Sequence, residues 1–246
     1  MDVAAVIALL SHEKSGVRRR AVMMLPGLTH GDPPTPEMVD ATIRLTTDPK
    51  KRVRDYACFV LGRQFHEVDT PELRDALAAR LDDVDRETRC EALVGLAYRR
   101  DPRALPRVRA ALTRPSGAVW QLEIVAAGAL GDPGLHPLLV PHRTGWDDEV
   151  ADQQADAACR LTDPDGPGED MLDGVADLCR RRGHELPDGD TLRSWRLMTV
   201  LLDIAPHRAA EFYDAVADRL EGDEPALREL RVDSALAQLA DEVRQR

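Results

Sequence analysis

The chain has 246 residues, a formal net charge of −11, and only nine Trp, Tyr or Phe residues. A chain of this length forms one or two domains with a buried core. The net charge argues against a general affinity for nucleic acid or for an anionic membrane, because both require positive protein surface. The acidic excess lies late in the chain: residues 1–150 hold 21 basic and 22 acidic side chains, and residues 151–246 hold 12 and 22.

The first elements predicted along the chain are pairs of helices. We expect helices at about 2–10 and 15–28, and then at about 36–46 and 51–64. Each of two later helices opens with a Thr-Pro-Glu sequence, at residues 35–37 and again at 70–72, where proline is tolerated at the first helical position. Val and Ile form no alternating runs of the kind that strands contain. The sequence therefore predicts an all-α fold.

A repeated motif supports this division into helix pairs. In three copies, Arg is followed by Ala three positions later and by Leu seven positions later: Arg18…Ala21…Leu25, Arg54…Ala57…Leu61 and Arg89…Ala92…Leu96. A fixed period of about 35 residues is typical of a solenoid of helical repeats. Weaker copies near 122–130 and 153–161 extend the pattern to about five repeats, at about 1–30, 35–66, 70–100, 101–131 and 132–161.

The region after this repeat array, residues 162–246, keeps amphipathic spacing but lacks the Arg motif. Helices are expected near 169–182, 190–204, 207–221 and 225–243. Terminal repeats have to cover the exposed end of a solenoid core. We interpret 1–161 as the repeat region and 162–246 as degenerate helical repeats or a C-terminal cap.

A two-helix repeat of 34–36 residues, with Asp-Pro at the turn (Asp48-Pro49) and Val-Arg opening the second helix (Val53-Arg54), resembles a HEAT repeat. The resemblance implies a right-handed superhelix with the second helices on its concave side. It also implies a scaffold that binds protein partners, with a few enzymes built on the same frame. A further implication is a structural ladder between neighbouring turns, formed by Arg18, Asp48, Arg54, Asp83 and Arg89.

The sequence offers no convincing catalytic, metal or cofactor site. Three His-Glu pairs, at 12–13, 66–67 and 184–185, are separated by 54 and 118 residues, which does not match the repeat period. A di-iron centre like that of deoxyhypusine hydroxylase would need equivalent positions. Basic clusters at 18–20, 50–54 and 99–100 lie at helix ends, and no Trp falls at a repeated position. Two alternatives remain open: a HEAT-like enzyme resembling bilin lyases or DNA glycosylases, and a nucleic-acid-binding module.

The cysteines and the first residues favour a cytoplasmic protein. The four cysteines form no CxxC pair, and we expect buried, reduced thiols at Cys58, Cys90, Cys159 and Cys179. The apolar stretch 2–10 lacks a basic leader and is too short to cross a bilayer.

Helical phase selects a candidate partner-binding stripe on the concave side. In the second helix of repeat two, Asp55, Phe59 and Arg63 lie four residues apart, opposite the face that packs inward. Transferring this phase to the neighbouring repeats gives the candidate set: Arg19, Met23, Asp55, Phe59, Arg63, Val94 and Tyr98. Apolar anchors beside charged side chains are typical of a peptide-binding groove. We predict a non-catalytic scaffold with a protein or peptide partner, and the acidic last third favours a basic one. The oligomeric state, and whether the C-terminal helices cover the stripe, stay open.

Overall fold

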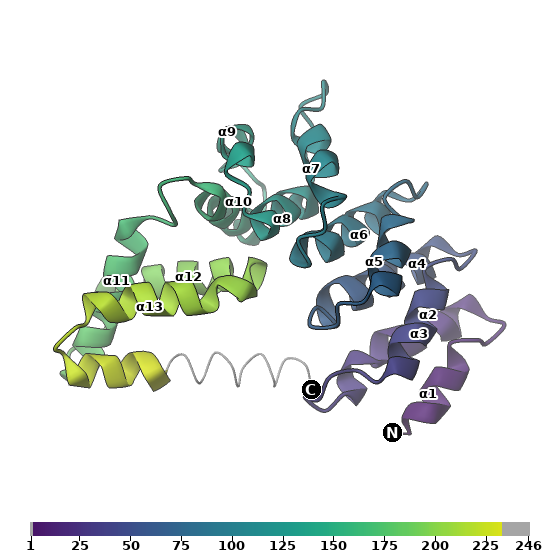
Figure 1. The fold of residues 1–246 in the computed structure, drawn as a ribbon, viewed down its shortest axis with the longest axis horizontal. Coiled ribbons are helices and arrows are strands. Elements are labelled where there is room, and N and C mark those ends of the chain that lie inside the picture. The colour runs from purple at the N-terminus through teal and green to yellow at the C-terminus, as the bar shows by residue number, and fades with distance from the viewer. Residues whose placement is uncertain (1, 233–246) are drawn as a thin grey trace. The chain divides into compact units, whose positions relative to one another are not determined.

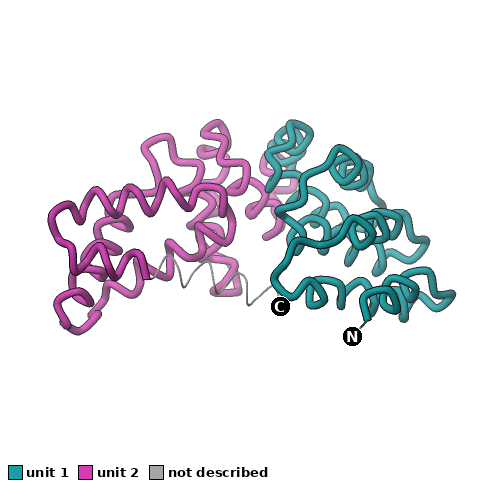
Figure 2. Tube along the Cα trace, turned by 60° about the horizontal axis from the view of Figure 1, so that its bottom comes forward, with its two compact units in different colours: residues 1–111, 241–246 teal, residues 112–240 magenta. Residues whose placement is uncertain are grey.

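The computed structural model describes residues 2–232. Within these residues every regular element is a helix and no strand occurs, which confirms the all-α class (Figure 1). The described residues divide into two compact units, unit 1 over 2–111 and unit 2 over 112–232 (Figure 2). This division does not test the predicted boundary at residue 161, which stays a prediction.

Unit 1 is built from paired helices in two layers. Its elements are α1 (Val3–Leu9), α2 (Ser15–Met24), η1 (Pro26–Leu28), α3 (Pro36–Leu45), α4 (Lys51–Phe59), η2 (Val60–Gln64), α5 (Pro71–Ala78), α6 (Arg86–Tyr98) and α7 (Ala104–Leu112). Helix α4 lies between α2 and α6, and α3 lies between α1 and α5 (Figure 1). The second helix of each predicted pair therefore packs beside the second helix of the next.

The sequence explains where these helices begin and end. The Oγ1 atoms of Thr35 and Thr70 accept bonds from backbone N–H groups three residues later, which caps α3 and α5 ahead of their prolines. The predicted helix 15–28 ends as an α-helix at Met24 and continues as the 3-10 turn η1, because Pro26 cannot donate an α-helical hydrogen bond. Helix α4 widens into the π-helical turn η2 at its C-terminal end.

The core between the layers is made of small and aliphatic side chains. The motif residues Ala57, Leu61 and Leu96 are fully buried. Helices α4–η2 and α6 approach each other closely at Gly62 and Gly95, where a Cβ atom built on Gly95 would lie 2.6 Å from the Gly62 Cα. Only glycine permits this contact between two backbones.

Unit 2 contains the remaining helices. They are α8 (Gln121–Leu130), η3 (Pro133–Leu135), α9 (His136–Leu139), η4 (Val140–His142), α10 (Glu149–Thr162), α11 (Glu169–Gly183), η5 (Gly189–Thr191), α12 (Leu192–Ile204), η6 (Pro206–Arg208) and α13 (Ala209–Arg219), followed by a helical stretch at 224–232. Helix α10 packs between α8 and α12, and α11 packs against α12 and α13. The part of the predicted helix 225–243 beyond residue 232 lies outside the described residues.

Two further sequence features are visible in the structure. All four cysteines are buried and none is in a disulfide, as predicted. No helix within residues 2–232 has both the length and the apolar character needed to cross a bilayer.

Candidate partner-binding face

The arginines of the repeated motif connect successive turns of unit 1. Arg18 donates from Nε and Nη2 to the two carboxylate oxygens of Asp48, at 2.6 and 2.9 Å. Arg54 donates in the same way to Asp83, at 2.8 and 2.7 Å. Burial raises the pKa of each aspartate, but the bonds from the arginine and from a backbone N–H, with the arginine charge, together hold it below its usual range. These bidentate pairs hold turns together, and the arginines are not available to a ligand.

A second set of bonds repeats with the same spacing. Arg18, Arg54 and Arg89 each donate from Nη1 to the carbonyl oxygen six residues earlier in the chain, at 2.7, 2.9 and 2.6 Å. The acceptor in the first turn belongs to His12, which occupies the position held by aspartate in the next two turns. Its Nδ1 accepts from the backbone N–H of Lys14 at 3.0 Å, as a carboxylate does in the other turns. His12 therefore acts as a turn residue here.

Arg99 is also structural, although the sequence places it in a basic cluster. Its side chain is buried, with the residue 6% exposed, and no carboxylate within residues 2–232 accepts a hydrogen bond from it. Its guanidinium instead donates to five backbone carbonyl oxygens, those of Leu61, Gly62, Phe65, Val68 and Gly95. Burial lowers the pKa of Arg99 to about 10. The cluster at 99–100 therefore does not contribute this residue to a nucleic-acid surface.

The exposed side of α2, α4–η2 and α6 carries most of the predicted stripe, and we call it the α4–α6 face. Met23 is 48% exposed. Phe59 is half-buried, and the Arg63 guanidinium lies 5.5 Å from the centre of its ring. Arg19 is placed similarly over Tyr56, at 5.9 Å. Both contacts are close enough for a cation–π interaction, so four of these side chains form two stacked pairs.

The predicted stripe fails on α6. Val94 is completely buried, so it cannot contact a partner on this surface. The reason is that α6 is enclosed by α4 and α5, and its buried side spans more than half of the helix. Tyr98 remains half-buried at the far end of the helix. The accessible side of α6 carries Glu87 and Glu91 instead. This side is shifted by one residue from the one that the transferred helical phase predicted.

Glu91 is the side chain on this face that sequence analysis missed. Its side chain is 12% exposed, and its Oε1 lies 3.7 Å from Arg63 Nη1, too long for a hydrogen bond. Its buried Oε2 has no hydrogen-bond partner among the described residues. Burial raises the pKa of Glu91 to about 7; Arg63 opposes this, and Asp55 and Glu87 add to it. The sequence signal that could have identified this site is the spacing of Glu87 and Glu91. Residues four apart lie on the same face of a helix.

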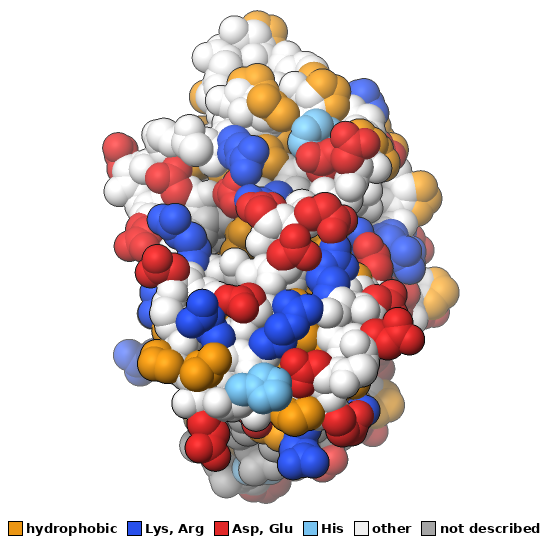
Figure 3. Space-filling model, turned by 90° about the vertical axis from the view of Figure 1, so that its left-hand side faces the viewer, with side chains coloured by type: hydrophobic (Ala, Val, Ile, Leu, Met, Phe, Trp, Pro, Cys, Tyr) orange, Lys and Arg blue, Asp and Glu red, His pale blue; other side chains and the backbone are white. Residues whose placement is uncertain are grey.

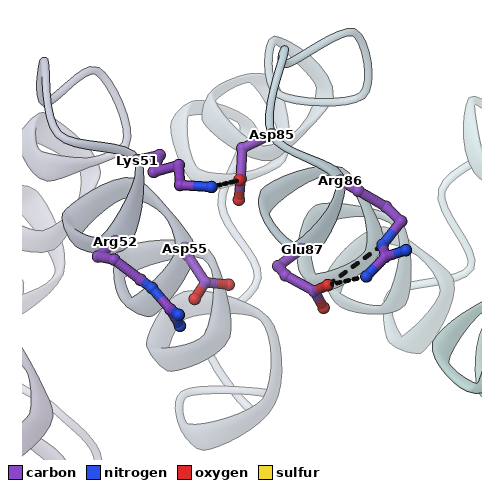
Figure 4. A pocket seen from close by; sticks show the side chains of 6 residues that line it. All are labelled: Lys51, Arg52, Asp55, Asp85, Arg86 and Glu87. Atoms are coloured by element: carbon purple, nitrogen blue, oxygen red, sulfur yellow. Dashed lines mark hydrogen bonds and ion pairs between the residues drawn. The ribbon is translucent and has the colours of Figure 1, made fainter.

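A second carboxylate lies in a hollow of about 290 Å³ between the N-terminal halves of α4 and α6. Asp55 points from α4 across the gap, and Glu87 lies opposite on α6 (Figure 4). The nearby Lys51 pairs with Asp85 at 3.0 Å, and Arg86 pairs with Glu87 at 2.6 Å. Burial and the charges of Asp85 and Glu87 raise the pKa of Asp55 to about 6. The α4–α6 face therefore holds two carboxylates, Asp55 and Glu91, whose pKa values are raised mainly by burial.

The free energy cost of one of these carboxylates is testable. An unfolded Glu titrates near 4.5, whereas folded Glu91 titrates near 7. Between these pH values the folded state retains a proton that the unfolded state has lost, so stability falls as pH rises through this window. We expect Glu91→Gln to increase the unfolding free energy by about 3 kcal/mol at pH 8, since the folded and unfolded pKa values differ by about 2.5 and each pKa unit is worth about 1.4 kcal/mol.

Urea unfolding at pH 8 and at pH 4 measures this effect. The gain should disappear at pH 4, where both states are protonated. Glu67→Gln, at an exposed position outside the face, serves as the matched control and should change stability by less than about 0.5 kcal/mol at either pH. A Glu91→Gln protein no more stable than the parent at pH 8 would contradict the assignment.

Outside the α4–α6 face, neither the charged side chains nor the potential metal ligands of the described residues indicate a binding site. Within residues 2–232, no three His, Cys, Asp or Glu side chains are grouped so that they could hold a metal ion. The face drawn in Figure 3 carries acidic and basic side chains interspersed, without an area of one sign. Phosphate binding requires clustered positive charge.

Comparison with known proteins gives a partial likeness. No protein-family model matches the chain. Protein YibA of Escherichia coli K12 is 37% identical over 97 residues, which cover 39% of this chain and 33% of YibA. YibA of Escherichia coli O157:H7 gives the same values. The chain thus matches only about a third of the length of these curated relatives.

A solved structure extends the likeness beyond that segment. The X-ray structure of Escherichia coli YibA superimposes with a TM-score of 0.50 at 27% sequence identity, over 64% of this chain and 53% of that one. The chain is therefore similar in sequence and in backbone arrangement to part of YibA.

Proposed function

We propose that the chain is a HEAT-like α-solenoid that acts as a non-catalytic interaction scaffold and binds a protein partner on its α4–α6 face. The layered helix pairs of unit 1 and the Arg18–Asp48 and Arg54–Asp83 bridges support the solenoid part of this proposal. In this regular frame the arginine and aspartate side chains join neighbouring turns.

One observation carries the binding part: Glu91 is a largely buried carboxylate, and its Oε2 has no hydrogen-bond partner among the described residues, at the edge of an accessible face. Such a group destabilises the folded chain, and burying a carboxylate without a donor is costly. Groups of this kind cluster at functional sites, where a ligand supplies the missing partner. Exposed Met23 and half-buried Phe59 lie on the same face and supply apolar contact area.

The alternatives have less support from the same residues. Arg18, Arg54 and Arg99 from the three basic clusters are engaged in ion pairs or carbonyl bonds within the fold. A nucleic-acid surface would need these groups to face solvent. The polar residues of the α4–α6 face include no nucleophile paired with a base, which is the arrangement that covalent catalysis requires.

Partner capture with matched variants tests the proposal. The tagged chain is compared with Met23→Asp and Phe59→Asp, each expected to weaken capture of a given partner at least about tenfold, because interface anchors contribute about 2 kcal/mol or more. Val84→Asp is the control: Val84 is 92% exposed in the turn before α6 and does not line the hollow between α4 and α6. Quantitative mass spectrometry measures the captured protein, and thermal unfolding verifies that all four chains fold. Equal capture by all four would overturn the proposal.

A further inference from the structure

The basic side chains at the α2 end of the α4–α6 face indicate the charge of the partner segment. We infer that the occupant is an acidic segment with apolar side chains, whose Asp or Glu carboxylates bind Arg19 and Arg20 while an apolar neighbour packs on Met23. This inference rests on the proposed scaffold function and specifies its partner.

Helix α2 carries positive charge and no negative charge. Its ten residues include three consecutive arginines and no Asp or Glu. Arg18 is engaged by Asp48. The side chains of Arg19 and Arg20 form no ion pair and no hydrogen bond with any of the described residues, and this includes Glu13, the acid that precedes the helix. The α2 end of the face therefore carries two positive charges that the described part of the chain does not pair.

Arg19 is held in place but lacks an acceptor. Its guanidinium lies 5.9 Å from the centre of the Tyr56 ring on α4, and its buried Nε has no hydrogen-bond partner among the described residues. Stacking on a ring uses the flat side of a guanidinium and leaves the N–H groups at its edge for a carboxylate, which Arg18 binds with two bonds. Because the stacking already orders the side chain, binding a carboxylate there costs little further conformational entropy.

The other charges of the face do not cancel this positive charge. Each acid on α6 and at its cap lies beside a cation, in the pairs Lys51–Asp85, Arg86–Glu87 and Arg63–Glu91. Three arginines then remain against one aspartate: Arg19, Arg20 and Arg52 against Asp55. The positive charge of Arg52 acts on Asp55, although no ion pair joins the two side chains (Figure 4). An acidic segment is therefore the electrostatic complement of the α2 end of the face.

This assignment differs from the basic partner that the overall charge of the chain favours. The acidic excess belongs to residues 151–246, and none of these residues is part of α2 or α4. The charges that contact a bound segment are those of the face itself. A chain of net charge −11 repels an acidic peptide in general, so binding of such a peptide identifies a local basic site.

The apolar part of the occupant follows from two side chains beside the arginines. Met23 lies one helical turn beyond Arg19 on α2 and is 48% exposed. Phe59 holds the corresponding position on the adjacent α4 and is half-buried. A methionine adapts to partner side chains of varied shape, because its thioether chain is flexible. A segment that combines acidic and apolar residues matches both features.

The test uses the full chain and three labelled twelve-residue peptides, with fluorescence anisotropy at pH 7 and 0.15 M salt. One peptide combines Glu with Leu, the second combines Lys with Leu, and the third combines Glu with Ser. We expect the Glu–Leu peptide to bind at least about tenfold more tightly than either of the others, since each of these lacks one of the two required features. Equal binding of the Glu–Leu and Lys–Leu peptides would overturn the inference. So would tighter binding of a twelve-nucleotide single-stranded DNA.

Matched variants locate the binding on α2. Arg19→Gln combined with Arg20→Gln should weaken binding of the Glu–Leu peptide at least about tenfold, the size of one charge-assisted hydrogen bond. Arg44→Gln combined with Arg100→Gln removes the same charge from two exposed positions, on α3 and after α6, and should leave the affinity unchanged. Thermal unfolding verifies that both double variants fold. Equal affinities of the two double variants would contradict the assignment to α2.

A charge reversal supplies a test that loss of folding cannot imitate. Arg19→Glu combined with Arg20→Glu is expected to exchange the preference, so that the Lys–Leu peptide binds more tightly than the Glu–Leu peptide. A variant that failed to fold would show no such exchange. A preference that stays with the Glu–Leu peptide would show that these two arginines do not bind its carboxylates.

Failure of this inference can be distinguished from failure of the scaffold proposal. If Phe59→Asp loses a captured partner but the Glu–Leu peptide does not bind, the scaffold function stands and the acidic-segment assignment is wrong. If neither the capture nor the peptide binding depends on the face, both are wrong.

Discussion

Replacing Arg99 by methionine is expected to destabilise the protein by about 4 kcal/mol, because each buried carbonyl left without a donor costs about 1–3 kcal/mol. Methionine fills a similar volume but donates no hydrogen bond. Five carbonyl oxygens, belonging to residues 61, 62, 65, 68 and 95, would lose the donor they share. A buried carbonyl without a donor destabilises the folded state. Water cannot supply the missing donors here, because the site is buried and Arg99 is only 6% exposed.

Urea unfolding measures this change, with the adjacent Arg100→Met as control. Arg100 is exposed, so its replacement should cost less than about 0.5 kcal/mol. Arg99→Lys gives a finer test: it keeps the charge but has three donors on a flexible stem, so it should recover less than half of the lost stability. If Arg99→Met were as stable as Arg100→Met, the carbonyl contacts would not be what holds this end of α4–η2 against α6.

Replacing Asp83 by alanine should cause the second largest loss of stability, about 3 kcal/mol at pH 7. Arg54 is 8% exposed and would keep its charge without the carboxylate that accepts two of its bonds. The backbone N–H of Asp85 would lose its acceptor as well. Replacing an exposed acid should have little effect, so Asp82→Ala, one residue earlier, is the matched control.

The pH dependence of this loss has a predictable sign. Despite its burial, Asp83 has its pKa lowered below 3.8 by the bonds from Arg54 and Asp85 N–H and by the arginine charge. A group with a depressed folded pKa contributes stability above its unfolded pKa, and that contribution is lost as the pH falls through the folded value. The difference between the parent and Asp83→Ala, measured by urea unfolding, should therefore shrink below about pH 4. A difference that stays constant from pH 7 to pH 3 would contradict the bridge.

The helix pairs were predictable because their signals are local. Thr35 and Thr70 cap helices through their own side chains, and Ala57, Leu61 and Leu96 recur at spacings that bury one side of a helix. The first helix of the predicted fifth repeat is less regular: α9 covers only His136–Leu139 between two 3-10 turns. Prolines at 133, 137 and 141 account for this, because each removes a backbone donor.

The candidate site was only partly predictable, because it depends on neighbouring helices. Asp55, Phe59 and Met23 were found from the phase of α4 and its transfer to α2. The same transfer failed at Val94, since α6 is enclosed on more of its circumference than α4. The missing partner of Glu91 and the burial of Arg99 arise from contacts between helices that are distant in sequence, which periodicity does not report.

The π-helical turn at Val60–Gln64 has a consequence for how such chains vary in length. A π-turn accommodates one residue more than an α-helical turn, so an inserted residue is absorbed there without shifting Arg54 before it or the Thr70 cap after it. The carbonyls of Leu61 and Gly62 lie at the C-terminal end of this helix, where the last carbonyls have no donor within the helix, and Arg99 supplies one to each.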